Sequence, residues 1–401
     1  MSEFRNSSTH ASAQAGWPMG IWLAVLSMSF ATFAIVSAEF LPAGLLTPMA
    51  ADLGISEGLA GQAVTATAVV GAVAALFANV VIGRLDRKLV LIALSLLTVA
   101  SNLMAAFADS FVMLLIARAA LGIALSGFWS LSSAVVARLV GINALGRGMS
   151  IIFVGVSLAT IAAPSVGALV SDLFGWRMAM FLAAGAAVIA TAVQVFALPR
   201  LPAAASNNLI SILRLTGRRG VQLGLLAVLL VAGGHFAGFV YVRAFLEQVT
   251  QMSPAMVAMT LLAFGIANFF GNLVGGAIAD RNQRLGLATV GTLMGLSALA
   301  LAFFGTNAIP AAGLAAIWGF AFGAGPIVLQ TGLAQAASDD LEGVGSLIVV
   351  LFQVSIATGA IVGGLLVDNL GVAYAIGFTG IMALGAVGLA AAPRRQVVPA
   401  E

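Results

Sequence analysis

Long apolar runs alternate with short polar stretches along the whole chain. A helix that crosses the hydrocarbon core of a bilayer needs about 20 apolar residues, and the runs have this length. They lack the residue-by-residue alternation of apolar and polar side chains that marks membrane β-strands. The pattern therefore predicts an all-α membrane protein with twelve transmembrane helices. The predicted spans are residues 19–47, 58–83, 89–108, 111–137, 148–170, 176–198, 221–247, 254–279, 285–305, 310–335, 344–368 and 372–392.

The composition indicates a surface that faces lipid. Of the 401 residues, 61% are hydrophobic and 8% are charged, whereas soluble proteins carry about 25% charged residues. The chain has no cysteine and two histidines, which excludes disulfides and His-rich metal sites. No P-loop pattern occurs, so direct ATP hydrolysis is excluded as the energy source. We expect no metal and no cofactor, and no nucleic-acid partner because the basic residues lie in short loops.

The basic residues also predict the orientation, because cytoplasmic loops carry an excess of Lys and Arg. Fourteen of the seventeen Lys and Arg residues fall on one side of this span arrangement. Arg177 and Arg243 fall on the other side, and Arg118 lies within a span. Both termini are therefore predicted to be cytoplasmic, in a multi-pass protein of the bacterial inner membrane.

A polar linker divides the predicted helices into two sets of six. Within this linker, residues 210–215 are expected to form a short amphipathic helix on the membrane face. The first apolar run is far longer than the apolar region of a signal peptide, which has about 7–15 residues. The predicted parts are a cytoplasmic tail at 1–18, a six-helix bundle at 19–198, the linker at 199–220, a second six-helix bundle at 221–392, and a tail at 393–401.

Matching residues recur 196 positions apart in the two halves, as Glu39-Phe40 and His235-Phe236 illustrate. Residues 163–167 and 359–363 stand at the same offset. The register indicates a duplication, with chance similarity between Ala- and Gly-rich helices as the alternative. Parallel repeats of this kind hold substrate near the midplane between the halves.

Two ionisable side chains lie deep inside predicted spans, and such residues are functional candidates by default because their charge is costly in lipid. Desolvation favours the neutral form of Glu39, so this carboxyl can take up and release a proton as its surroundings change. His235 changes charge near neutral pH and can relay protons or bind substrate. The alternative for each is a structural role, in which the buried group has hydrogen-bond partners within the protein.

Several motifs resemble the major facilitator superfamily over the whole chain. Segment 83–88 (GRLDRK) is similar to a shortened form of the loop motif between the second and third helices of that family. Segment 118–122 resembles the fourth-helix motif, and segment 155–167 resembles the fifth-helix motif of the proton-driven antiporters. Segment 39–58 is similar to the purine ribonucleoside exporters of the family.

The resemblance implies the major facilitator fold and alternating access. It further implies a proton-coupled antiporter that exports purine ribonucleosides or related base analogues and works as a monomer in membrane lipid. Export of sugars or of many drugs by the same kind of transporter is the alternative. A membrane enzyme would need a nucleophile and base or a metal cluster at one depth, and the sequence offers neither. A channel or receptor fits poorly with the two-half repeat.

The resemblance also implies a charge network that holds the inner gate shut, with structural anchoring as the alternative. We expect Arg118 near the inner end of its helix, close to Asp86. The predicted gating residues are Asp86, Arg87, Arg118, Asp280 and Arg281.

A nucleoside presents a flat base and a sugar with several hydroxyls, so its pocket needs aromatic faces together with amide or hydroxyl partners. Packing is the alternative for every such residue. The candidates within the spans are Phe40, Phe128, Trp129, Phe236, Tyr241, Asn268, Asn272, Gln330 and Gln353.

Overall fold

A computed structural model describes residues 17–82, 85–141, 144–202, 215–337 and 341–391. Within these ranges, twelve helical segments are long and apolar enough to cross a membrane, which confirms the predicted number. The terminal tails and nearly all of the predicted amphipathic segment 210–215 lie outside the described residues.

The first six spans are single helices. They are α1 (Met19–Leu53), α2 (Glu57–Ile82), α3 (Arg87–Ala106), α4 (Phe111–Val140), α5 (Leu145–Phe174) and α6 (Trp176–Ala197). The predicted end of the first span at residue 47 is too early, because α1 continues through Pro48 to Leu53. Gly54 then ends the helix with a left-handed backbone (φ 63°), a conformation that glycine adopts without strain.

The seventh span is interrupted, although a continuous helix over 221–247 was predicted. A π-helical turn at residues 229–233 and a break at Tyr241 divide it. Inserted π turns often mark functional sites in helices. The span consists of α8 (Arg219–Val228), η2 (Leu229–Gly233), α9 (Gly234–Phe239) and α10 (Val242–Gln248).

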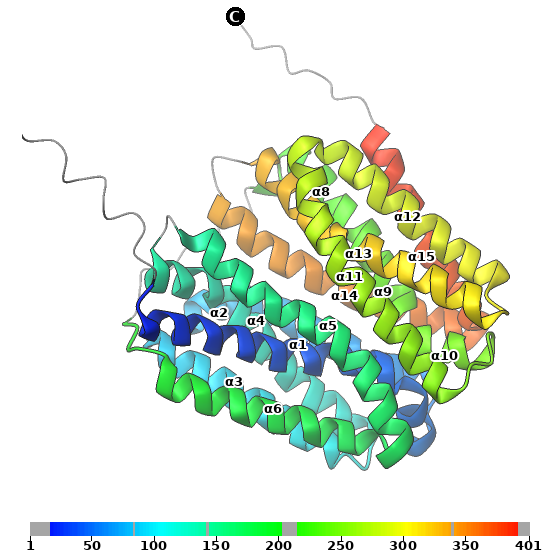
Figure 1. The fold of residues 1–401 in the computed structure, drawn as a ribbon, viewed down its shortest axis with the longest axis horizontal. Helices are drawn as coiled ribbons and strands as arrows, with labels where there is room; N and C mark the ends of the chain where they lie inside the picture. The colour runs from blue at the N-terminus through cyan, green and yellow to red at the C-terminus, as the bar shows by residue number, and fades with distance from the viewer. Residues whose placement is uncertain (1–16, 83–84, 142–143, 203–214, 338–340, 392–401) are drawn as a thin grey trace, which may run out of the picture.

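The remaining five spans are again single helices. They are α11 (Pro254–Arg281), α12 (Gln283–Phe304), α13 (Ala308–Ala336), α14 (Leu341–Leu370) and α15 (Val372–Ala391). Figure 1 shows the N-terminal half, coloured blue to green, beside the C-terminal half, coloured green to red.

The same helix contact recurs in both halves. A Cβ atom added to Gly155 on α5 would lie 2.1 Å from the carbonyl oxygen of Ser29 on α1. A Cβ atom added to Gly359 on α14 would lie 2.3 Å from the carbonyl oxygen of Gly233 in the seventh span. Both pairs are 126 residues apart in sequence (155 − 29 and 359 − 233). The repeated spacing confirms two six-helix pseudo-repeats. The predicted register is wrong at these helices, because the matching contacts are 204 residues apart (359 − 155 and 233 − 29) rather than 196.

Small residues bring the two halves together along two helix pairs. α2 packs along α14, and α5 packs along α11. A Cβ atom added to Gly265 on α11 would lie 2.6 Å from the Cα atom of Ile161 on α5. Close approach of this kind is how helices associate in lipid, where no hydrophobic effect drives them together.

Candidate functional site

Glu39 lies on α1 beside a small cavity between the two halves. The cavity has room for about one water molecule. No described residue forms a hydrogen bond or ion pair with the Glu39 carboxylate. An ionisable group thus stands unpaired where the halves meet. The cavity is lined by Glu39, Phe40, Ala43 and Val64 of the N-terminal half and by Phe236, Phe239 and Val240 of the C-terminal half.

Two predicted substrate-binding rings meet at this cavity. The ring centroids of Phe40 and Phe236 are 6.1 Å apart, with 29° between the ring planes. Phe239 approaches the same Phe40 ring edge-on at 6.0 Å. Phe40 and Phe236 therefore contact each other across the two halves.

His235 points away from this cavity into the C-terminal half. Its Nδ1 atom accepts a hydrogen bond of 3.1 Å from Nε1 of Trp318, and its ring stacks on Phe322 with centroids 3.4 Å apart. An indole N–H is only a donor, so Nδ1 carries no proton in this state and the imidazole is neutral. The side chain is fully buried. Nε2 of His235 has no hydrogen-bond partner among the described residues. Glu39 is the stronger candidate for proton coupling because it lines the cavity between the halves, whereas His235 does not.

The expected proximity of Arg118 to Asp86 is wrong. Arg118 lies about two turns into α4, whereas Asp86 precedes α3, and α3 and α4 run in opposite directions. At 1.5 Å per residue the two side chains are about 20 Å apart along the bundle. Arg118 instead donates a hydrogen bond of 2.7 Å from Nη1 to the carbonyl oxygen of Ala38, next to Glu39, and Nη2 lies 3.1 Å from Sδ of Met180.

Asp86 and Arg87 anchor the start of the linker. The Asp86 carboxylate caps α3 by accepting a hydrogen bond of 2.8 Å from the backbone N–H of Lys88. It also accepts one of 3.2 Å from the N–H of Leu201, and the N–H of Arg87 donates to the Leu201 carbonyl at 2.8 Å. The side chain of Asp280 lies outside the described residues, and Arg281 is exposed at the end of α11. The gating role of this set remains a prediction.

Two substitutions of Asp86 separate capping from gating. Asparagine caps helices about as well as aspartate, whereas alanine loses about 1 kcal/mol. If capping is the role, Asp86→Asn keeps wild-type stability and transport, and Asp86→Ala lowers the melting temperature of the purified protein by a few degrees. Reduced turnover in both variants at unchanged melting temperature would instead indicate a gating charge.

The remaining substrate candidates lie apart from the cavity. Phe128 is fully buried in the N-terminal half, edge-on to Trp129, which packs against Phe153. Asn272 and Gln330 are half-buried on α11 and α13, and these helices pack together within the C-terminal half. Buried Asn268 on α11 presents its backbone carbonyl to Gly323 of α13. Packing is the simplest role for Phe128, and the other candidates stay predictions.

The two ends of the helix bundle differ in their content of arginine. The Arg-rich end is the one at which α1 and α3 begin, and the Arg-poor end is the one at which they finish. Tyr241 lies toward the Arg-poor end, where its hydroxyl donates a hydrogen bond of 2.9 Å to the Ala360 carbonyl. Gln353, near the middle of α14, reaches toward Gly71 of α2.

Polar contacts across the halves gather at the Arg-poor end. Nη2 of Arg243 donates to the Asp172 carboxylate at 2.7 Å, and Nη1 donates to the Gly44 carbonyl. The Asp368 carboxylate of α14 accepts hydrogen bonds from Oγ of Ser56 at 2.7 Å and from the N–H of Gly58 at 3.0 Å. These contacts close the interface at this end.

Asp368 and Asp172 were not predicted from the sequence to have a role. The available signal was a carboxylate close to the end of a predicted span. That signal marks a charged residue but does not show which helix from the other half supplies its partner.

A sequence profile described as Major Facilitator Superfamily matches residues 28–350. The chain belongs to the major facilitator superfamily. Two relatives are each named purine ribonucleoside efflux pump NepI. The protein of Shigella sonnei is 38% identical over 363 residues, covering 90% of this chain and 92% of the relative. The protein of Salmonella typhimurium is 38% identical over 374 residues, covering 93% of this chain and 94% of the relative.

Solved structures of transporters share the fold. The nucleoside transporter NupG has a TM-score of 0.74 at 17% identity, covering 92% of this chain and 98% of that one. A bacterial homologue of the human lysosomal transporter Spinster, inward-facing and occupied, has a TM-score of 0.73 at 13% identity, covering 94% and 95%. The chain is thus a transporter rather than an enzyme, and a multi-pass protein of the bacterial inner membrane.

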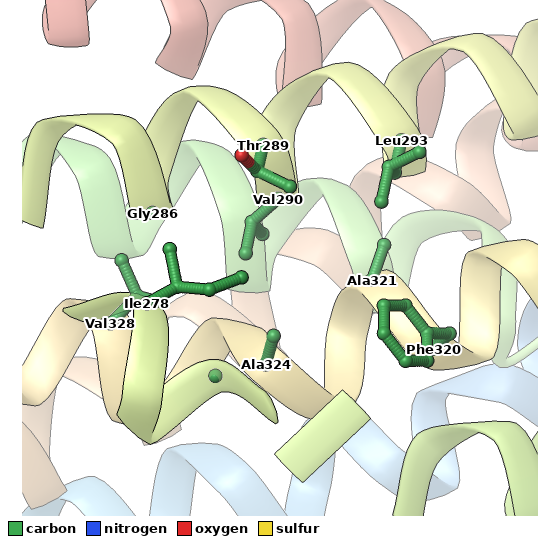
Figure 2. Close-up of a pocket in the computed structure, with 10 residues that line it drawn as sticks. Ile278, Gly286, Thr289, Val290, Leu293, Phe320, Ala321, Ala324 and Val328 are labelled. Atoms are coloured by element: carbon green, nitrogen blue, oxygen red, sulfur yellow. The ribbon is translucent and has the colours of Figure 1, made fainter. Parts of the chain in front are cut away.

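The protein has a second small cavity within its C-terminal half, between α11, α12 and α13. Figure 2 shows the side chains that line it, among which Thr289 is the one with a polar atom. Gly275 lies against Ala324 here, since an added Cβ atom would be 2.7 Å from the Ala324 Cα atom. An apolar gap of this kind offers no group to orient a polar substrate, so we assign it to helix packing.

Proposed function

We propose that this transporter exports purine ribonucleosides in exchange for protons by alternating access. The unpaired carboxyl of Glu39 at the cavity between the halves is the observation that carries the proposal. Such a group exchanges protons with whichever side the site faces, because its charged form is disfavoured when it is buried. The name and the 38% identity of the relatives support the substrate class. One chain contains both halves of the path, so we propose that a monomer is sufficient.

The proposed substrate class is tested by counterflow in liposomes that contain the purified protein and a saturating internal nucleoside. We expect labelled inosine and guanosine to accumulate transiently, and excess adenosine to compete. An excess of arabinose or of a lipophilic cation such as ethidium should not compete. Counterflow of arabinose or ethidium without counterflow of inosine would show the alternative substrate class and overturn the proposal.

We also propose that the Arg-rich end is cytoplasmic. Reporter proteins fused after Arg219 and after Arg395 should both be active as cytoplasmic reporters, and a reporter fused near Asp109 should be active only outside. Paired alkaline phosphatase and fluorescent-protein fusions measure this directly. A cytoplasmic signal at Asp109 would contradict the proposed orientation.

A further inference from the structure

Two buried polar groups from opposite halves meet at Gly71, near the middle of α2. Gln353 of α14 is 5% exposed and Ser126 of α4 is 1% exposed. A Cβ atom added to Gly71 would lie 2.3 Å from Nε2 of Gln353 and 2.8 Å from Oγ of Ser126. Neither Nε2 of Gln353 nor Oγ of Ser126 has a hydrogen-bond partner among the described residues. A buried donor without a partner costs about 1–3 kcal/mol, and a ligand that pairs with these two groups would remove that cost.

The internal repeat shows what is unusual about the position of Ser126. The backbone carbonyl of Thr67 faces Gly122 in the same way that the carbonyl of Asn268 faces Gly323, which relates these helices by an offset of 201 residues (268 − 67 and 323 − 122). At this offset Ser126 corresponds to Ile327. The N-terminal half therefore has a hydroxyl where the C-terminal half has an aliphatic side chain. The two halves supply different chemistry to the path between them.

The polar pair and the aromatic cavity lie at neighbouring depths. Gly71 follows Val64, which lines the Glu39 cavity, by seven residues on α2. Seven residues of helix span about 10 Å, the scale of one nucleoside. A base in contact with Phe40 and Phe236 would thus direct its sugar toward Gln353 and Ser126. Sugar hydroxyls both donate and accept, which matches an amide N–H and a serine hydroxyl.

We propose that Gln353 and Ser126 bind the sugar hydroxyls of the nucleoside and so select ribosides. The inference rests on the proposed function, because it requires a nucleoside substrate. In the present state α2 and α14 are in contact over the pair. Separation of the halves exposes both groups to the path, and a bound sugar then satisfies them.

The test compares inosine with 2′,3′-dideoxyinosine, which keeps the base and lacks two sugar hydroxyls. In liposomes that contain the full chain, Gln353→Leu should raise the KM for inosine about tenfold, the loss expected for one hydrogen bond. The KM for dideoxyinosine should not change. Ser126→Ala, which removes a single atom, should act in the same direction and guards against misfolding of the larger change.

Asn102→Leu is the matched control. Asn102 is fully buried and its amide also lacks a partner among the described residues, but it lies on α3, which packs against α4 and α6 within one half. This variant should affect inosine and dideoxyinosine alike. Equal weakening of both ligands by Gln353→Leu and Ser126→Ala would overturn the inference while leaving nucleoside transport intact. Absence of inosine transport by the wild-type protein would overturn both this inference and the proposed function.

Discussion

Replacing Glu39 with glutamine is expected to abolish accumulation of nucleoside against a gradient while preserving exchange. The amide keeps the size and hydrogen-bonding capacity of the protonated acid but cannot titrate. Substrate exchange returns a loaded carrier without a net proton step, so it does not need the titration. Net transport in Glu39→Gln should therefore fall to passive equilibration, and Glu39→Asp should retain part of the coupling because its carboxyl lies at a different depth.

Vesicles that contain each variant separate these outcomes. Uphill uptake under an imposed pH gradient measures coupling, and exchange at equal pH measures binding and turnover. His235→Asn serves as the comparison, because its side-chain oxygen can replace Nδ1 as the acceptor for Trp318. It should keep uphill uptake. Uphill uptake by Glu39→Gln at near wild-type rates would show that another group couples the proton.

Replacing Arg243 with leucine is expected to open the Arg-poor end and to lower transport at least tenfold. The side chain of Arg243 is 3% exposed and bonds to Asp172 across the halves and to Glu247 on its own helix. Removing one partner of a buried ion pair costs about 3–5 kcal/mol, because the other charge is left unpaired. That cost falls on the state closed at this end, so the equilibrium shifts by a hundredfold or more toward the state open there.

Cysteine labelling measures this shift without background from other positions of the protein, since the chain has no cysteine. A single cysteine at Val64, which lines the Glu39 cavity, should react faster with an impermeant maleimide in intact cells when Arg243→Leu is present. Arg177→Leu is the matched control, because Arg177 pairs with Asp52 at the same end but within the N-terminal half. Equal labelling rates in wild type, Arg243→Leu and Arg177→Leu would remove Arg243 from the closure.

The helices and the repeat could be predicted from the sequence because each depends on a pattern that lipid imposes. Apolar length predicted the twelve spans, and similar residues in the two halves predicted the duplication, although the register is 204 residues at the Gly155 and Gly359 contacts rather than 196. The break in the seventh span was not predictable from hydropathy, because a π turn at residues 229–233 leaves the apolar run unchanged.

Side-chain direction and pairing were the parts that sequence patterns could not supply. His235 was predicted to be the repeat partner of Glu39, yet it bonds to Trp318 and does not line the cavity. The error in placing Arg118 beside Asp86 was avoidable. The order of the spans already gives the direction of α4, and that direction places Arg118 far from Asp86. The polar pair of Gln353 and Ser126 needed the structure, because 227 residues separate them in sequence (353 − 126).

Uptake of labelled inosine into inverted membrane vesicles tests the central claim most directly. With the interior made acidic, export should appear as accumulation inside the vesicles. A protonophore that collapses the pH gradient should then release the accumulated inosine, and Glu39→Gln vesicles should show no accumulation. Accumulation that persists after the gradient is collapsed, or wild-type vesicles that take up no inosine under an acid-inside gradient, would contradict proton-coupled nucleoside export.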